Sequence, residues 1–422
     1  MKSSSELEFA ALLRPGMRVF LPGSSGEPGG LLDALAAHPE AAAGVTFVQF
    51  PIPGMNTTDF TSFHPSARME TFFMTPQLQD GFAAGRVAFV PMQLRRVFDY
   101  LQRGPAFDFV WLQVAPPDEN GRYGLAPNVD FASAALANAK AVVAEINAGF
   151  RAPLTSLALP AQRIDYVLHT NHPLRQQAAT RIDAVAQAIG THVATLVRDG
   201  DCVQTGIGQI PAAVLAALSE RNDLGLHSGL IDPSVQALIE RGVITGQAKT
   251  LDRGLHVTGA ALGDTALYDW LATQAAVAFR PASHTHEISA MRQIDNFVSI
   301  NSAVEVDLYG QVNAEMIGTR QVSGTGGAVD FMRGAAASNG GRSIVALLAT
   351  AREGAVSRIV PALSTGTAAT AARTDVDYVI TEFGVAHLWG ASQATRAAAL
   401  IDIAAPAHRD ALRDAWRKLG KL

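Results

Sequence analysis

The segment Gly200-Asp-Cys-Val-Gln-Thr-Gly-Ile-Gly-Gln-Ile-Pro211 predicts a β-strand, a glycine-rich turn and the first turn of a helix. Apolar residues follow its proline after three, four, six and seven positions, which is the spacing of one helix face. The earlier segment that begins at Gly16-Met-Arg-Val19 repeats the pattern, with the same offsets counted from Pro28. This internal echo predicts two α/β domains of similar build.

The rest of the chain alternates short apolar runs with longer helical patterns, which favours mostly parallel sheets covered by helices. We therefore expect an α/β fold with an N-terminal domain at residues 1–194 and a C-terminal domain at residues 195–422 that carries the ligand site. The predicted strands outside the second glycine-rich segment are Arg18–Leu21, Val45–Phe50, Arg86–Val90, Asp108–Val114, Ala141–Ile146, Phe297–Ile300, Ser343–Leu348 and Tyr378–Thr381.

Composition excludes several classes of protein. The 422 residues are 48% hydrophobic and 17% charged, which is typical of a folded domain and not of a disordered chain. A net charge of −5 provides no basic footprint for nucleic acid or an anionic membrane. Glu6 and Glu8 interrupt the apolar stretch that a signal peptide needs, and the single cysteine, Cys202, excludes an intramolecular disulfide. A cytoplasmic α/β protein is the expectation.

Two glycine-rich loops are candidate anion sites. Gln204–Gly208 precedes a predicted helix, whose first N–H groups are free to bind a phosphate, a carboxylate or an oxyanion. Ser323–Gly327 is the second such loop, and neither loop has the spacing of the dinucleotide-binding fingerprint. The alternative for both is a tight turn without a ligand.

Histidines gather in the second half of the chain. His284-Thr-His286 and His227 are suited to proton transfer, because imidazole titrates near neutral pH. A His-x-His pair also suits zinc, although the spacing provides no evident third ligand. The remaining alternative is that they are polar loop residues.

Four segments together resemble the acetyl-CoA hydrolase/CoA-transferase family, the group that holds 4-hydroxybutyrate and succinyl-CoA:acetate CoA-transferases. The resemblance extends over nearly the whole chain and implies two α/β domains and a reaction on an acyl-CoA. The segments are Gln113–Asp118 with Gly121, Asp199–Gly208, Ser299–Leu308 with Gly310 and Asn313, and Thr381–Ala386.

The resemblance also implies how coenzyme A is bound. It makes coenzyme A a substrate or product, with an acyl-CoA and a small carboxylic acid as partners, no metal, and a possible homodimer. Gly326 and Gly327 would offer an oxyanion N–H, and Arg352 would meet a CoA phosphate in place of a family lysine. The implied contact residues are Gln204, Thr205, Gly206, Ile207, Gly208, Ala303, Ser323, Gly326, Gly327 and Arg352.

The chain departs from the family where the chemistry is expected. Transferases of the family use a glutamate that attacks the thioester and forms a mixed anhydride. In the matching stretch, Leu224-Gly-Leu-His-Ser-Gly229, that position is Gly229. His286 replaces a family asparagine, and His387 and Trp389 replace an aspartate and an arginine further on.

These departures favour hydrolysis of the thioester over transfer. We expect His286, with a neutral-range pKa, to activate a water, and name His227 and Glu305 as further catalytic candidates. Three other readings stay open: transfer by another carboxylate such as Glu70, Glu305 or Glu382, a lyase reaction on a CoA ester, and a non-catalytic acyl-CoA-binding protein.

Overall fold

The computed structural model describes residues 2–3, 11–178 and 180–420, which form two compact units. Unit 1 consists of the described residues of Met1–Ala179 together with Gly229–Pro233 and Val257–Thr285. Unit 2 consists of Thr180–Ser228, Ser234–His256 and the described residues of His286–Leu422. Because two later segments return to unit 1, the limits of the units do not coincide with a single division near residue 195.

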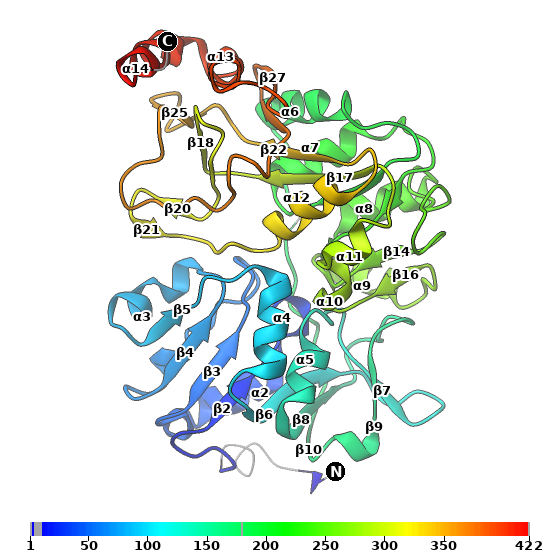
Figure 1. Cartoon of the computed structure of the whole chain (residues 1–422). Coiled ribbons are helices and arrows are strands. Elements are labelled where there is room, and N and C mark those ends of the chain that lie inside the picture. Colours follow the sequence, from blue (N-terminus) through cyan, green and yellow to red (C-terminus); the bar gives the residue numbers. More distant parts are fainter. Residues whose placement is uncertain (1, 4–10, 179, 421–422) are drawn as a thin grey trace. The chain divides into compact units, whose positions relative to one another are not determined.

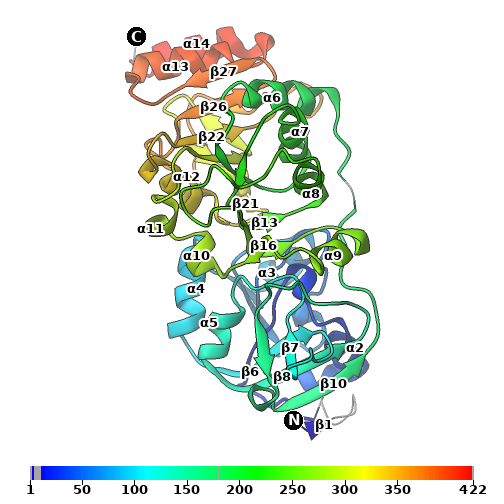
Figure 2. The ribbon, with the colours of Figure 1, turned by 90° about the vertical axis from the view of Figure 1, so that its right-hand side faces the viewer.

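Unit 1 contains an eight-stranded sheet in which every strand pair is parallel. Helix α2 (Gly29–Ala37) covers one face, and α4 (Leu94–Arg103) with α5 (Ala132–Ala137) covers the other (Figures 1 and 2). In spatial order, the strands are β1 (Lys2–Ser3), β10 (Tyr166–Thr170), β8 (Ala139–Asn147), β6 (Phe107–Val114), β2 (Arg18–Phe20), β3 (Thr46–Gln49), β4 (Arg68–Thr71) and β5 (Val87–Phe89).

Unit 2 contains a six-stranded sheet that is parallel except for the antiparallel pair at one edge. Helices α6 (Ala184–Ala194) and α7 (Gln209–Ala217) lie against one face, and α12 (Ala328–Ala337) lies against the other (Figure 2). In spatial order, the strands are β12 (Gly225–Leu226), β11 (Cys202–Thr205), β17 (Phe297–Ser302), β22 (Arg342–Ala346), β26 (Tyr378–Thr381) and β27 (Gly384–His387).

Shorter elements complete the described part of the chain. The further strands are β7 (Arg122–Gly124), β9 (Ala158–Pro160), β13 (Leu230–Ile231), β14 (His256–Thr258), β15 (Ala260–Ala261), β16 (Val277–Phe279), β18 (Glu305–Asp307), β19 (Val312–Asn313), β20 (Met316–Ile317), β21 (Arg320–Gln321), β23 (Thr350–Ala351), β24 (Val356–Ser357) and β25 (Ile359–Val360). The further α-helices are α3 (Gln79–Ala83), α8 (Pro233–Glu240), α9 (Thr265–Leu271), α10 (Ala282–Thr285), α11 (Ile288–Met291), α13 (Gln393–Asp402) and α14 (Arg409–Lys418). The 3₁₀ helices are η1 (Ser24–Gly26), η2 (Pro39–Ala42), η3 (Phe60–Ser62), η4 (Pro76–Leu78), η5 (Ala161–Arg163) and η6 (Pro406–His408).

The α/β fold with mostly parallel sheets is confirmed, and each predicted strand has a counterpart in the two large sheets. The internal echo corresponds to β2 followed by α2 and to β11 followed by α7. Pro28 is the residue before α2, and Pro211 lies in the first turn of α7. Strands β4 and β10 are not among the predicted strands, because each combines two buried residues with polar residues that interrupt the apolar run.

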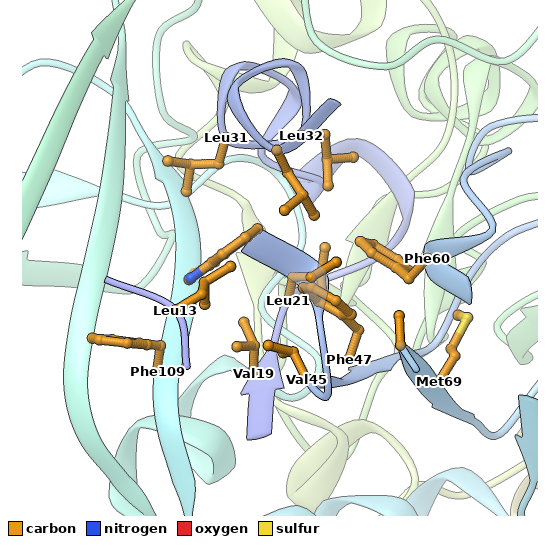
Figure 3. Packing of buried hydrophobic residues seen from close by; sticks show 14 of the residues in the cluster. Leu13, Val19, Leu21, Leu31, Leu32, Val45, Phe47, Phe60, Met69 and Phe109 are labelled. Carbon is orange, nitrogen blue, oxygen red and sulfur yellow. The ribbon is translucent and has the colours of Figure 1, made fainter. Parts of the chain in front are cut away.

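The core of unit 1 centres on Phe47 of β3 (Figure 3). Its ring stacks on Phe60 at 4.6 Å between centroids and meets the ring of Trp111 nearly edge-on at 6.0 Å. All three side chains are fully buried. Aromatic pairs of this kind contribute more than their buried area alone, so this cluster fixes how β3 packs against β6 and η3.

Phe47→Ala should therefore lower the free energy of unfolding by roughly 3–5 kcal/mol, because it removes a ring from a closed core and leaves a cavity. Urea unfolding followed by tryptophan fluorescence measures this loss. Phe82→Ala is the matched control, since Phe82 is 40% exposed and its change should stay within about 0.5 kcal/mol. An equal loss in both variants would contradict the central role of Phe47.

Within the described residues, every helix is too short or too polar to cross a lipid bilayer.

Candidate active site

Each large sheet has one point at which the strand order reverses. In unit 1 the chain proceeds from β2 to β3 on one side and later returns to β6 on the other. In unit 2 it proceeds from β11 to β12 and later returns to β17. The loops that leave such a point diverge, and ligands of open α/β sheets bind in the crevice outside the carboxyl ends of the strands there. The glycine-rich loops of the internal echo follow β2 and β11 and therefore occupy these two positions.

The loops predicted to bind CoA leave room beside their backbone. Gly208 has a φ of +107° and directly precedes α7, and Gly327 directly precedes α12. A β-carbon at Gly206, Gly208 or Gly326 would meet no atom of the described residues within 4 Å. Both loops thus leave open space beside half-buried backbone at the start of a helix, where N–H groups favour an anion.

Buried amides join the two strands at the reversal point of unit 2. Gln204 at the end of β11 and Asn301 at the end of β17 exchange hydrogen bonds, with 3.4 Å from the Gln204 amide nitrogen and 3.1 Å from that of Asn301. Both residues are more than nine-tenths buried. This pair fixes the end of β11, from which the loop Thr205–Gly208 departs.

His227 and Ser228 follow the neighbouring strand β12 at the same edge. The backbone N–H of His227 donates to the carbonyl of Val203 at 3.2 Å, and its ring meets that of Phe297 edge-on at 6.0 Å. Ser228 Oγ donates to the carbonyl of Thr205 at 3.1 Å. The side chains of both residues are buried, so this segment is tied to the candidate CoA loop immediately before Gly229.

The glutamates offered as catalytic candidates have structural partners. Glu305, at the start of β18, accepts a hydrogen bond from the Asn313 amide at 3.1 Å. Glu382, which follows β26, accepts from the backbone N–H of Ala349 at 2.8 Å. Glu70 of β4 forms an ion pair with Arg18 of β2 at 3.3 Å in unit 1.

The remaining CoA candidates lie on loops of unit 2. Ala303 is half-buried between β17 and β18, and Ser323 is half-buried after β21. Arg352 is exposed in a tight turn with a φ of +51°. Because Arg352 is exposed, its guanidinium can be reached by a phosphate from solvent.

His286 is buried beside the ring of Phe331. Its exposed fraction is 1%, and its ring lies 4.4 Å from that of Phe331 between centroids. Burial lowers its pKa to about 3, because the imidazolium cannot be solvated there. The expectation of a neutral-range titration at His286 is therefore wrong, because the sequence does not show that this side chain is buried. The catalytic roles of His286, His227 and Glu305 stay predictions.

Asp130 of unit 1 carries a buried carboxyl oxygen that the sequence did not single out. It belongs to a segment that is hydrogen-bonded to β15 and the residue before it. Val129 N–H donates to the carbonyl of Gly259 at 2.9 Å, and Asn128 forms an isolated antiparallel β-bridge with Ala260. The residue is half-buried, but its Oδ1 is fully buried and has no hydrogen-bond partner among the described residues. No motif marks this position, because Asn128-Val-Asp130 reads as an ordinary polar turn.

Asp130 faces glycine backbone. A β-carbon at Gly259 would stand 1.8 Å from Asp130 Oδ1 and 3.3 Å from the carbonyl oxygen of Gly229. Gly259 is therefore the residue that admits the carboxyl group beside Gly229. Burial raises the pKa of Asp130 to about 7, because no positive charge or donor compensates the loss of water around the carboxylate.

Asp130→Asn should raise the free energy of unfolding relative to wild type, and by more at pH 8 than at pH 4. The folded-state pKa of about 7 lies above the unfolded value of about 3.9, so wild-type stability falls as pH rises through that window. The variant lacks this loss, and the difference should approach at most about 4 kcal/mol. Urea unfolding across the pH series measures it. Asp269→Asn, an exposed change on α9, should give no such pH-dependent difference from wild type. A difference between wild type and Asp130→Asn that does not vary with pH would contradict the raised pKa.

Two family models match this chain. Residues 1–174 match the family described as the acetyl-CoA hydrolase/transferase N-terminal domain, and residues 263–416 match its C-terminal domain. The 4-hydroxybutyrate coenzyme A transferase of Clostridium kluyveri is 37% identical over 402 residues, covering 95% of this chain and 94% of that protein.

Two further relatives are similar over the whole chain. The succinyl-CoA:cyclohexane-1-carboxylate CoA transferase of Geobacter metallireducens is 34% identical and covers 100% of this chain and 96% of that protein. The crystal structure of RipA from Yersinia pestis is 31% identical with a TM-score of 0.93, covering 100% of this chain and 98% of that one.

Proposed function

This chain belongs to the acetyl-CoA hydrolase/transferase family, and we propose that it hydrolyses the thioester of a short acyl-CoA. We favour hydrolysis because residue 229 is a glycine. It stands where the resemblance places the nucleophilic glutamate of the transferases. Glycine has no carboxylate, so the mixed anhydride that transfer requires has no atom on which to form at this residue.

Coenzyme A would be bound by backbone N–H groups and by one positively charged side chain. The N–H groups at the starts of α7 and α12 are suited to anionic oxygens, and Gly208 and Gly326 leave room for close approach. Arg352 supplies a charged donor for a phosphate. A Gly327 N–H would stabilise the oxyanion that forms when water adds to the thioester carbonyl.

Transfer by another carboxylate is the second candidate. Glu70, Glu305 and Glu382 each already bind a partner, through an ion pair or a hydrogen bond. A carboxylate that is engaged in this way must first break its contact to attack a thioester, which disfavours it as a nucleophile. A small carboxylic acid would be the product of hydrolysis and the acceptor in transfer.

Incubation with acetyl-CoA, propanoyl-CoA or butyryl-CoA, with and without an acceptor acid, tests the proposal. Hydrolysis predicts free thiol from at least one of these esters at a rate that is independent of the acceptor. Formation of a new acyl-CoA only when the acceptor is present would establish transfer instead. Neither product, with CoA binding retained, would support a non-catalytic binding protein.

Gly208→Val should abolish CoA binding in calorimetry, because its side chain fills the space beside the loop backbone. Gly242→Val is the matched control, since Gly242 also has a positive φ and open space but lies on the turn after α8. Both changes strain the backbone, so only the position differs. Wild-type CoA affinity in Gly208→Val would place the CoA site elsewhere.

A further inference from the structure

We propose that His408 is a positioning residue for coenzyme A binding. It holds the turn that carries Arg352 in the conformation in which this guanidinium meets a phosphate of CoA, and it does not touch the ligand itself. The inference rests on the proposed function, because that proposal assigns Arg352 to a CoA phosphate. Both residues and all of the contacts between them belong to unit 2.

The turn that carries Arg352 has an uncommon backbone conformation. It connects the antiparallel strands β23 and β24, and Arg352 is exposed at its start. Arg352 has a φ of +51° and Glu353 a φ of +55°, in the left-handed region that residues with a side chain rarely adopt. Strain of this kind persists only where the surrounding structure fixes the conformation, and it gathers at ligand-binding turns.

Contacts from distant segments hold this hairpin at both ends. At the tip, His408 Nε2 lies 2.9 Å from the carbonyl oxygen of Gly354. A carbonyl oxygen can only accept, so Nε2 carries the hydrogen and donates. At the base, Ala349 N–H donates to Glu382 Oε2 at 2.8 Å, and Arg358 N–H donates to the carbonyl of Ala349 at 2.8 Å. Glu382 fixes where the hairpin begins, and His408 fixes its turn.

The segment that carries His408 is itself anchored. His408 is half-buried, ends η6 and directly precedes α14, yet its side chain makes no capping hydrogen bond to the described residues of that helix. Its neighbour Arg409 donates to the carbonyl of Ala404 at 2.9 Å and lies over the ring of Phe383. The imidazole therefore connects a fixed segment to a carbonyl 54 residues away in the sequence.

This connection matters for binding because a flexible arginine turn must be ordered when the phosphate arrives. A turn that already has the bound conformation avoids that cost. When only a fraction of the molecules has the competent conformation, the apparent affinity falls by that fraction. His408 thus contributes to CoA affinity through the population of the left-handed turn at Arg352 and Glu353.

Calorimetry with CoA tests the role of His408. His408→Ala should weaken CoA binding about 3- to 10-fold, which is the size of one hydrogen bond. His408→Gln keeps an N–H donor at about the position of Nε2 and should bind CoA like the wild type. His192→Ala is the matched control, since His192 is a half-buried histidine on α6 of the same unit. Urea unfolding of each variant checks that the fold persists.

A double-mutant cycle with Arg352→Gln separates positioning from a merely structural role. Arg352→Gln alone should weaken CoA binding more than about tenfold, because it removes a charged donor. His408→Ala should add little to that loss, since it acts through Arg352. Dephospho-CoA, which lacks the phosphate on the ribose, then identifies the phosphate. The effect of His408→Ala disappears with this ligand if Arg352 meets the ribose phosphate and persists if it meets the pyrophosphate.

Glu353 provides a test of the backbone strain. Asparagine adopts the left-handed region more readily than glutamate or glutamine. The loss caused by His408→Ala should therefore shrink in the Glu353→Asn background. It should stay unchanged in the Glu353→Gln background, which removes the same charge without that conformational preference. An equal loss in both backgrounds would contradict a turn that His408 holds against strain.

The outcomes separate this inference from the proposed function. Wild-type affinity in His408→Ala, or an equal loss with and without Arg352, overturns the positioning role and leaves the hydrolase proposal intact. Wild-type CoA affinity in Arg352→Gln overturns both the positioning role and the phosphate contact. If the wild type binds CoA but releases no thiol from any ester tested, hydrolysis is refuted, and the calorimetric cycle still decides the role of His408.

Discussion

Parallel hydrogen bonding within the two sheets is the constraint on which the rest of this structure depends. Parallel neighbours need a crossover for each connection, so strand and helix must alternate and both sheet faces become covered. Parallel strands also end at one common edge. In unit 2, Gln204, His227, Asn301 and Glu382 lie at or just after the carboxyl ends of four strands, although they are far apart in sequence.

Two carboxyl groups of unit 1 with raised pKa values differ in the partners that stabilise their charged forms. Glu27 lies between η1 and α2, where burial raises its pKa, but Gln49 donates to one of its oxygens and Arg175 pairs with the other at 2.9 Å. Burial raises the pKa of Asp130 without such compensation. A satisfied carboxylate fastens neighbouring segments, whereas an unsatisfied one is held at a cost and is suited to exchange a proton.

Family membership fixes less of the chemistry than of the fold. The relatives from Clostridium kluyveri and Geobacter metallireducens are named as CoA transferases, and the fold agrees with the solved structure of RipA. In the family resemblance, Gly229 stands at the position of the glutamate that the transferases use as a nucleophile. The proposed hydrolysis requires no change in the fold around Gly229, because this segment is held through its backbone carbonyl, which accepts from the N–H groups of Gly259 and Ala260.

The sequence by itself determined the α/β class, the strands of the interior, the echo of strand, loop and helix, and the family, because these depend on local hydrophobic period and on contiguous motifs. The tertiary structure decided what depends on distant segments meeting. Two later segments of the chain return to unit 1. Burial beside Phe331 lowers the pKa of His286 out of the neutral range, and Gly259 leaves room for Asp130 near the Gly229 carbonyl. Burial and the pKa values that follow from it belong to three-dimensional neighbours, which one-dimensional spacing does not specify.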